Sequence, residues 1–185
     1  MFEEDIQEPS GSLPAGLPWA VDLFGEYLAF SDGDADETEV DANTALDRGL
    51  TNEMLPHTIS IMLLYFSGRW CPLCEQFDAT VRDVYSGLKA LPESNEVELV
   101  WISCDICEAT YQAHLRMLGN VLAAVWLPKR LEEIGRHYGV EGLPTLLVLK
   151  AEDGSLLSSA GREEVLDAVS GDSSTLAWAG GQSVA

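Results

Sequence analysis

Apolar positions in the middle of the chain first follow a strand pattern and then a helical one. Residues 59–66 form an almost unbroken apolar run, which predicts a strand buried on both faces. The next apolar residues recur at steps of three and four and predict a helix that begins near Cys71: Phe77, Val81, Val84, Leu88 and Leu91. Pro72 suits the first turn of that helix, because the N–H that proline lacks would have no helical partner there.

The same two patterns recur toward the C-terminus. Residues 97–103 predict a second buried strand, and the apolar positions after it predict two helices: Tyr111, Leu115 and Leu118 in one, and Leu131, Ile134 and Tyr138 in the next. Residues 145–149, a turn at 152–154 and residues 156–157 then predict an antiparallel hairpin. We therefore expect an α/β fold: a central mixed sheet with helices on both faces and a C-terminal antiparallel hairpin.

The two ends of the chain and one acidic segment lack these patterns. Residues 1–17 predict a flexible acidic tail, residues 18–170 the domain, and residues 171–185 a loose tail apart from Trp178. Within the domain, residues 19–30 predict a first strand or a short helix. Residues 31–41 hold six acids but lack the glycine and the terminal glutamate of a calcium loop, which favours a solvated acidic loop.

Composition narrows the classes of partner and location. A chain of 185 residues that is 46% hydrophobic can bury one substantial core. The net charge of −21 makes nucleic acid and membrane surfaces poor partners. The start is acidic and no apolar run approaches the roughly 18 residues of a membrane span, so we expect a cytoplasmic or nuclear protein.

All four cysteines fall into two CxxC pairs, which indicates redox or metal chemistry rather than a disulfide-stapled secreted domain. The first pair lies between a buried strand and a helix. Cys71 is then at the helix N-terminus, where unpaired amides and the helix dipole stabilise a thiolate. Cys74 lies about one turn further on and is less exposed, so it can attack a mixed disulfide formed by Cys71. We predict that Cys71 is the nucleophile and Cys74 the resolving thiol.

Several neighbours complete the predicted active site. Trp70 supplies an apolar wall, Pro72 restrains the loop, and Leu73 lies between the two cysteines. Residues 142–145 read Gly-Leu-Pro-Thr immediately before a later strand, so Leu143 offers its backbone to an extended substrate and Pro144 adds no thiol or imidazole ligand. We expect no cofactor and no metal at this site.

Four segments together carry a family resemblance. Leu-Tyr-Phe-Ser-Gly-Arg-Trp-Cys-Pro-Leu-Cys, Val-Trp-Ile-Ser-Cys-Asp, Tyr-Gly-Val-Glu-Gly-Leu-Pro-Thr-Leu and Gly-Arg-Glu-Glu-Val resemble the tryparedoxin and nucleoredoxin branch of the thioredoxin superfamily. The resemblance covers roughly residues 18–178. It implies a thioredoxin-like fold, protein-disulfide reductase activity and a cis Pro144 beside the dithiol.

The resemblance also implies partners. They are disulfide-containing proteins such as peroxiredoxins, with a low-molecular-weight dithiol or a flavoprotein reductase as electron donor, and the chain is expected to be a monomer. The alternative function is a redox-gated, protein-binding regulator of the nucleoredoxin type. Three departures from the tryparedoxin pattern leave the donor open: Leu73 replaces a proline, Cys104 replaces a tryptophan and Glu164 replaces a basic residue.

The second CxxC leaves three alternatives. Cys104 ends the second buried strand and Cys107 starts the next helix, near the same sheet edge as Cys71. The two thiols are inert, form a candidate second redox pair, or join the first pair in a four-cysteine metal site. The 29 residues between Cys74 and Cys104 exceed the usual zinc-ribbon gap of about 15 to 20.

Titratable groups near the thiols give a weaker signal. The three histidines, His57, His114 and His137, form no recognisable constellation with the cysteines and are expected on the surface or on helix faces. Tyr65 stands where thioredoxins place a buried acid, so proton transfer from Cys74 needs another group or water. Asp105, placed in the active-site shell, and Glu108 are candidates, although acids at such positions commonly cap a helix.

Overall fold

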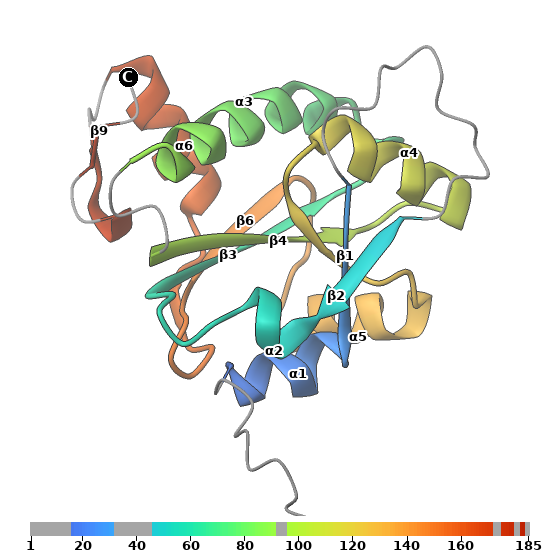
Figure 1. The fold of residues 1–185 in the computed structure, drawn as a ribbon. Helices are drawn as coiled ribbons and strands as arrows, with labels where there is room; N and C mark the ends of the chain where they lie inside the picture. Colours follow the sequence, from blue (N-terminus) through green and yellow to red (C-terminus); the bar gives the residue numbers. More distant parts are fainter. Residues whose placement is uncertain (1–15, 32–45, 92–95, 172–174, 180–181, 184–185) are drawn as a thin grey trace, which may run out of the picture.

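The computed structural model describes residues 16–31, 46–91, 96–171, 175–179 and 182–183 (Figure 1). Most of the expected tail 1–17 and nearly all of the acidic loop 31–41 lie outside these residues, so those predictions stay untested. The first half contains α1 (Pro18–Phe24), β1 (Tyr27–Phe30), β2 (Asp47–Leu50), α2 (Thr51–Met54), β3 (Ile61–Ser67) and α3 (Pro72–Lys89). The second half contains β4 (Val97–Ser103), α4 (Glu108–Leu118), β5 (Leu122–Ala124), α5 (Pro128–His137), β6 (Thr145–Lys150), β7 (Leu156–Ser158), α6 (Gly161–Ser170), β8 (Thr175–Leu176), the 3-10 helix η2 (Ala177–Ala179) and β9 (Gln182–Ser183).

A seven-stranded sheet in the order β2-β1-β5-β4-β3-β6-β7 forms the centre of the fold. β3 pairs in parallel with β4, and β4 in parallel with β5, whereas β1, β6 and β7 run antiparallel to their neighbours. This confirms the predicted mixed sheet with a C-terminal hairpin. Because Ser67 is paired with Ser103, β3 and β4 end at the same edge, and both CxxC segments follow from that edge.

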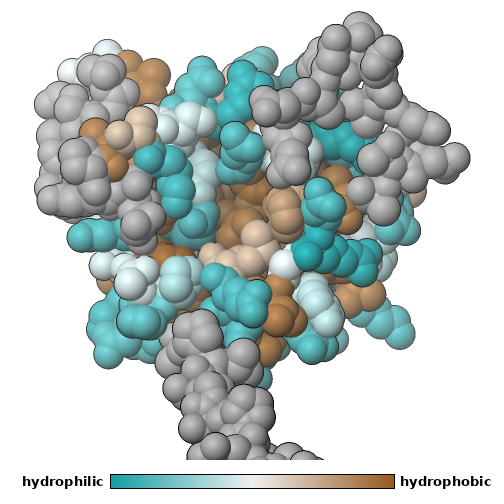
Figure 2. Space-filling model, viewed as in Figure 1, coloured by the Kyte–Doolittle hydropathy of each residue, from teal (hydrophilic) through white to brown (hydrophobic). Residues whose placement is uncertain are grey.

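Helices cover both faces of the sheet, with α3, α4 and α6 on one side and α1, α2 and α5 on the other (Figure 1). Successive residues of a strand point to opposite faces, so β3 serves two cores. Tyr65 belongs to the core under α3 and α4, and Phe66 to the core over α1 and α5. Figure 2 shows apolar residues in the middle of one side of the molecule, bordered by polar ones.

The strands and helices expected from residue 59 to residue 158 are all found. Where one element was expected in residues 19–30, the structure has both α1 and β1. Among the described parts of the chain, no helix is long and apolar enough to cross a membrane.

The prediction was wrong at the C-terminal end. It placed no helix after the hairpin, yet α6 packs there with only Val165, Ala168 and Gly161 buried, too few apolar positions to reveal a helical period. The expected loose tail 171–185 is also wrong in its described part. Leu176 and Ala179 are 1% and 7% exposed and belong to the core beside α6. An isolated apolar pair gives no periodic signal, so only tertiary packing reveals it.

Candidate active site

Cys71 is the N-cap residue of α3, with an extended backbone at φ −100° and ψ 110°. The backbone N–H of Cys74 points at its sulfur over 3.3 Å. Pro72 occupies the first turn, as predicted. The Cys71 sulfur therefore lies at the positive end of an 18-residue helix with an amide donor directed at it, an arrangement that stabilises negative charge on sulfur.

Cys74 lies one turn inside the helix and is fully buried, whereas Cys71 keeps 7% of its surface exposed. This confirms the predicted order of exposure. Burial, reinforced by the hydrogen bond with Cys71, raises the pKa of the Cys74 thiol to about 12. Cys74 is consequently held as a thiol until a base removes its proton, and it is less accessible than Cys71.

The loop before β6 faces the dithiol. The Leu143-Pro144 bond is cis, as the resemblance implied, and the carbonyl oxygen of Leu143 lies 3.9 Å from the Cys71 sulfur. A cavity of about 390 Å³ opens beside this loop, with Leu143, Cys104 and Phe66 among its walls. Of the predicted shell residues, Leu143 therefore lies beside Cys71, and the buried Pro144 follows it across the cis bond.

Trp70 and Leu73 are both more than half exposed beside the dithiol. The Trp70 indole donates a hydrogen bond of 2.7 Å to the carbonyl of Cys104, which connects the two CxxC segments. Gly68 permits this contact, because a Cβ added there would lie 2.8 Å from the indole nitrogen and 3.1 Å from the Cys104 oxygen.

The second CxxC is arranged differently. Cys107 is the exposed N-cap of α4, and hydrogen bonds from the Thr110 hydroxyl and backbone amide lower its pKa. Cys104 is half-buried just after β4, and burial, with the charge of Asp105, raises its pKa to about 11. All four cysteines are free. Among the described residues, which include these four, no group of three or more metal-binding side chains converges.

His114 was predicted wrongly. It is fully buried in α4, and its two ring nitrogens lie 3.0 Å from carboxylate oxygens of Asp78 in α3 and Asp105 after β4. Tyr65 donates a 2.6 Å hydrogen bond to the other oxygen of Asp78. His57 and His137 are exposed, as expected. The polar cluster Tyr65, Asp78, His114 and Asp105 lies directly behind the dithiol.

Asp105 does not cap the helix, because Cys107 does. It accepts hydrogen bonds from the Arg69 amide and the Ser103 hydroxyl as well as facing His114. Burial alone would raise the pKa of Asp105, but these hydrogen bonds lower it below its usual value. Burial likewise opposes charge on His114, yet its two carboxylate partners raise its pKa.

Sequence reasoning missed the cluster because its members come from separate elements. Asp78 and His114 are 36 residues apart, so no local spacing marks them. The available signal was a polar residue at a buried helix position, since Asp78 follows Phe77 and His114 precedes Leu115, both of them core residues.

Fold and dithiol together define a thioredoxin-fold protein with a paired-cysteine site. The family model described as thioredoxin-like matches residues 60–156, just over half of the chain. The chain therefore belongs to the thioredoxin-like family, which supports a thiol–disulfide redox function.

Individual relatives agree with this. Probable nucleoredoxin 3 of Oryza sativa subsp. japonica is 35% identical over 99 residues, 54% of this chain and 20% of that protein. Tryparedoxin of Trypanosoma brucei brucei is 26% identical over 106 residues, 57% of this chain and 72% of that protein. Native tryparedoxin I of Crithidia fasciculata shares the fold with a TM-score of 0.64 at 20% identity, over 83% of this chain and 94% of that one. The match to mouse nucleoredoxin likewise covers only 23% of that protein.

Proposed function

We propose that the chain is a protein-disulfide reductase that works through Cys71 and Cys74. One observation carries the proposal: the Cys71 sulfur lies at the start of α3, receives the Cys74 amide and faces the Leu143 carbonyl, with Cys74 buried beneath it. The site thus combines a sulfur at a helix N-terminus, a backbone carbonyl beside it at which an extended substrate can bind, and a second sulfur one helical turn away.

The reaction takes place in two exchanges. The Cys71 thiolate attacks one sulfur of a substrate disulfide, forms a mixed disulfide and releases the other substrate sulfur as a thiolate. Cys74, once deprotonated, then attacks the Cys71 sulfur, which forms the Cys71–Cys74 disulfide and releases the second substrate thiolate. The substrate gains two electrons and the dithiol loses two; the proton of Cys74 is lost before its attack, and the released substrate thiolates take up protons from solvent.

The proposed substrates are disulfide-containing proteins such as peroxiredoxins, bound as extended segments along Leu143. The electron donor is proposed to be a low-molecular-weight dithiol or a flavoprotein reductase. A solved tryparedoxin II is a complex with glutathionylspermidine, which supports including a small thiol among the candidates.

Reduction of insulin disulfides with dithiothreitol as donor tests the proposal. We expect turnover by the wild-type chain and only the background rate with Cys71→Ser. Cys107→Ser is the matched control, since it removes an exposed N-cap sulfur from the other CxxC. Equal turnover by Cys71→Ser and wild type would contradict the proposal.

A second candidate is the redox-gated binding module. The 35% identity to probable nucleoredoxin 3 and the net charge of −21 favour it, because a strongly acidic surface attracts basic partners. The same assay separates the two. Partner capture that changes with the redox state of Cys71 and Cys74, without catalytic turnover of insulin, would favour the binding module over the reductase.

A further inference from the structure

The resolving step proposed above requires a base for Cys74, and the cluster behind the dithiol contains one. Cys74 and Asp78 are four residues apart on α3, so their side chains are neighbours on one face of the helix. Both are buried, at 0% and 4% exposure. Burial is the main cause of the raised pKa of Cys74, followed by its hydrogen bond with Cys71, and the negative charge of Asp78 acts in the same direction.

We propose that Asp78 accepts the proton of Cys74 in the resolving step, an inference that rests on the proposed function. His114, held by Asp105, is the positioning residue for Asp78. The role of the buried acid then passes from the strand position occupied by Tyr65 to the helix. Tyr65 instead donates its hydroxyl proton to Asp78 and orients it.

The proton transfer moves charge within the cluster without changing the total. Each ring nitrogen of His114 faces a carboxylate oxygen at 3.0 Å, so the paired carboxylates hold the ring as an imidazolium that donates from both nitrogens. Two carboxylates and one imidazolium carry a net charge of −1. Moving a proton from Cys74 to Asp78 shifts that negative charge to sulfur without adding a new charge to the interior.

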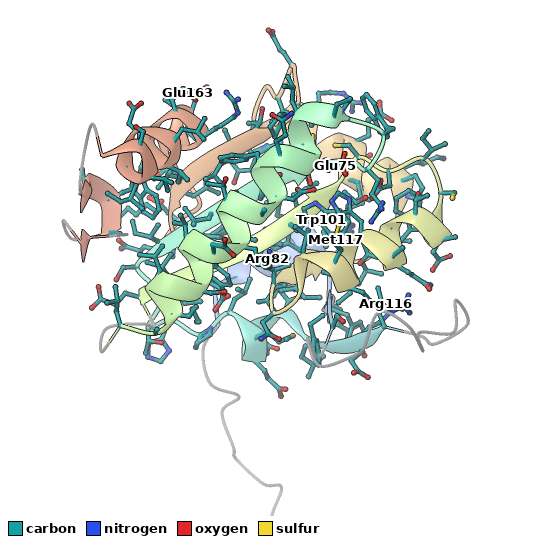
Figure 3. All side chains as sticks on the ribbon, turned by 90° about the horizontal axis from the view of Figure 1, so that it is seen from above. Glu75, Arg82, Trp101, Arg116, Met117 and Glu163 are labelled. Atoms are coloured by element: carbon teal, nitrogen blue, oxygen red, sulfur yellow. The ribbon has the colours of Figure 1, made fainter. Side chains whose placement is uncertain are left out.

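The groups that face Asp78 come from three elements: Tyr65 from β3, Cys74 from its own helix and His114 from α4. Asp105 faces His114 from the loop after β4, and Cys71 adjoins Cys74. Trp101, seen between α3 and α4 in Figure 3, packs edge-on against His114 with ring centroids 4.6 Å apart. Its indole is held by the Ser67 hydroxyl at 2.9 Å. This packing covers the imidazole on the sheet side.

After the proton transfer, the resolving exchange forms one sulfur–sulfur bond and breaks one. The Cys74 thiolate attacks the Cys71 sulfur, the Cys71–Cys74 bond forms, and the bond from Cys71 to the substrate sulfur breaks. The substrate leaves as a thiolate and is protonated from solvent. Asp78 returns its proton to solvent before the disulfide is reduced again.

Stopped-flow reaction of the reduced protein with 5,5′-dithiobis(2-nitrobenzoate) separates the two exchanges. In a Cys104→Ser, Cys107→Ser background, a first thionitrobenzoate is released when Cys71 attacks, and a second when Cys74 displaces it from the mixed disulfide. We expect Asp78→Asn to slow the second release at least about tenfold near pH 7 and to leave the first within about twofold. The deficit should shrink as the pH rises, because hydroxide then removes the Cys74 proton.

Asp83→Asn is the matched control, an exposed carboxylate on the same helix, and should change neither phase. A role of Asp78 in electrostatics alone predicts the opposite sign: without its charge the pKa of Cys74 falls and the second release accelerates. An unchanged or faster second phase in folded Asp78→Asn would overturn the proposal. A wild type that shows no fast first release would instead overturn the proposed reductase function.

Nitrogen NMR of His114 provides a test that does not depend on the folding of Asp78→Asn. The proposal requires both ring nitrogens to carry protons at pH 7 in the reduced wild-type protein. A His114 ring with one unprotonated nitrogen at pH 7 would overturn the proposal.

Discussion

The two CxxC segments have the same cysteine spacing, but the helix that follows begins at a different cysteine in each. In the first, α3 begins directly after the first cysteine, so Cys74 occupies the third helical position beneath Cys71. In the second, α4 begins only after the second cysteine, Cys107, so Cys104 stays in the loop and Thr110 takes the third helical position. The residue at which the helix starts decides whether a CxxC places both sulfurs in one helical turn.

This difference reverses the electrostatics of the pairs. In the first pair the leading sulfur receives a helix amide and the trailing sulfur is buried with a raised pKa. In the second the trailing sulfur, Cys107, is the exposed N-cap with a lowered pKa, and the leading Cys104 has the raised one. The buried polar cluster adjoins both pairs, because Asp105 lies between Cys104 and Cys107 whereas Asp78 lies on α3, one turn after Cys74. A matching motif therefore does not imply a matching reaction.

The largest expected effect is the different outcome of replacing Cys71 and of replacing Cys74. Cys71→Ser should lower turnover of insulin disulfides by about 1,000-fold or more, a barrier increase of roughly 4 kcal/mol, because the attacking sulfur is gone. Cys74→Ser should instead accumulate mixed disulfides with the substrate, detectable by non-reducing electrophoresis and mass spectrometry. Equal trapping by the two variants would contradict the assignment.

The next effect concerns the buried cluster of Tyr65, Asp78, His114 and Asp105, which links α3 to the second CxxC segment. His114→Gln removes the cation between two buried carboxylates and should cost about 3 to 5 kcal/mol of unfolding free energy near pH 6, measured by urea denaturation. The His114 pKa is raised on folding, so its contribution is complete below the unfolded value of about 6.5 and is lost as the pH rises through the folded value. The difference in unfolding free energy between wild type and His114→Gln should therefore decrease above about pH 7.

Acid should also reduce the difference in unfolding free energy between wild type and His114→Gln, for a different reason. Folding lowers the pKa of Asp105, so its contribution is present above about pH 4 and is lost as the pH falls through the folded value. His137→Gln, an exposed substitution, is the control and should give a small change at every pH. A gap of constant size from pH 5 to pH 9 would mean that charge on His114 does not stabilise the fold.

The sequence was sufficient for the first pair because its signals are local. A buried strand, a CxxC and an amphipathic helix lie within one continuous stretch, and Pro72 marks the helix start. The same local reasoning placed Cys104 and Cys107 at a strand end and a helix start. It left the fate of the second pair open, because exposure and the hydrogen bonds of Thr110 depend on where α4 begins.

The cluster and the C-terminal elements could not be predicted in this way. His114, Asp78 and Asp105 meet only after α3 and α4 pack on the same sheet face, and each has an ordinary solvated interpretation when taken alone. α6 and the residues after it contribute few buried side chains, so their packing leaves no period in the sequence. Long-range pairing, rather than propensity, determines both.

Alkylation should sharpen the contrast within the second pair. At pH 7.5 iodoacetamide should modify Cys107 at least about 100-fold faster than Cys104, because Cys107 is exposed with a lowered pKa while that of Cys104 is about 11. Peptide mass spectrometry over time measures the two rates. Raising the pH to about 9 should accelerate Cys104 more than Cys107, and comparable rates at pH 7.5 would contradict the inferred asymmetry.

The smallest expected effect is on catalysis by the first pair when the second is removed. Replacing both Cys104 and Cys107 by Ser should keep insulin turnover within about tenfold, a barrier change of roughly 1.4 kcal/mol. The exchange between Cys71 and Cys74 is chemically complete without them. Serine is also a good N-cap, so Cys107→Ser keeps the start of α4, and the Trp70 indole binds the backbone carbonyl of residue 104, which the substitution retains.

The single variants act as controls for this double replacement, and circular dichroism monitors the fold. If turnover collapsed in a variant that retains the helical content of the wild type, the second pair would belong to the mechanism as an electron relay. The contact between Trp70 and Cys104 would then be the route by which the two pairs influence each other. If turnover persists, the shared spacing of the two motifs carries no shared catalytic role, and the place where each helix begins is the feature that separates them.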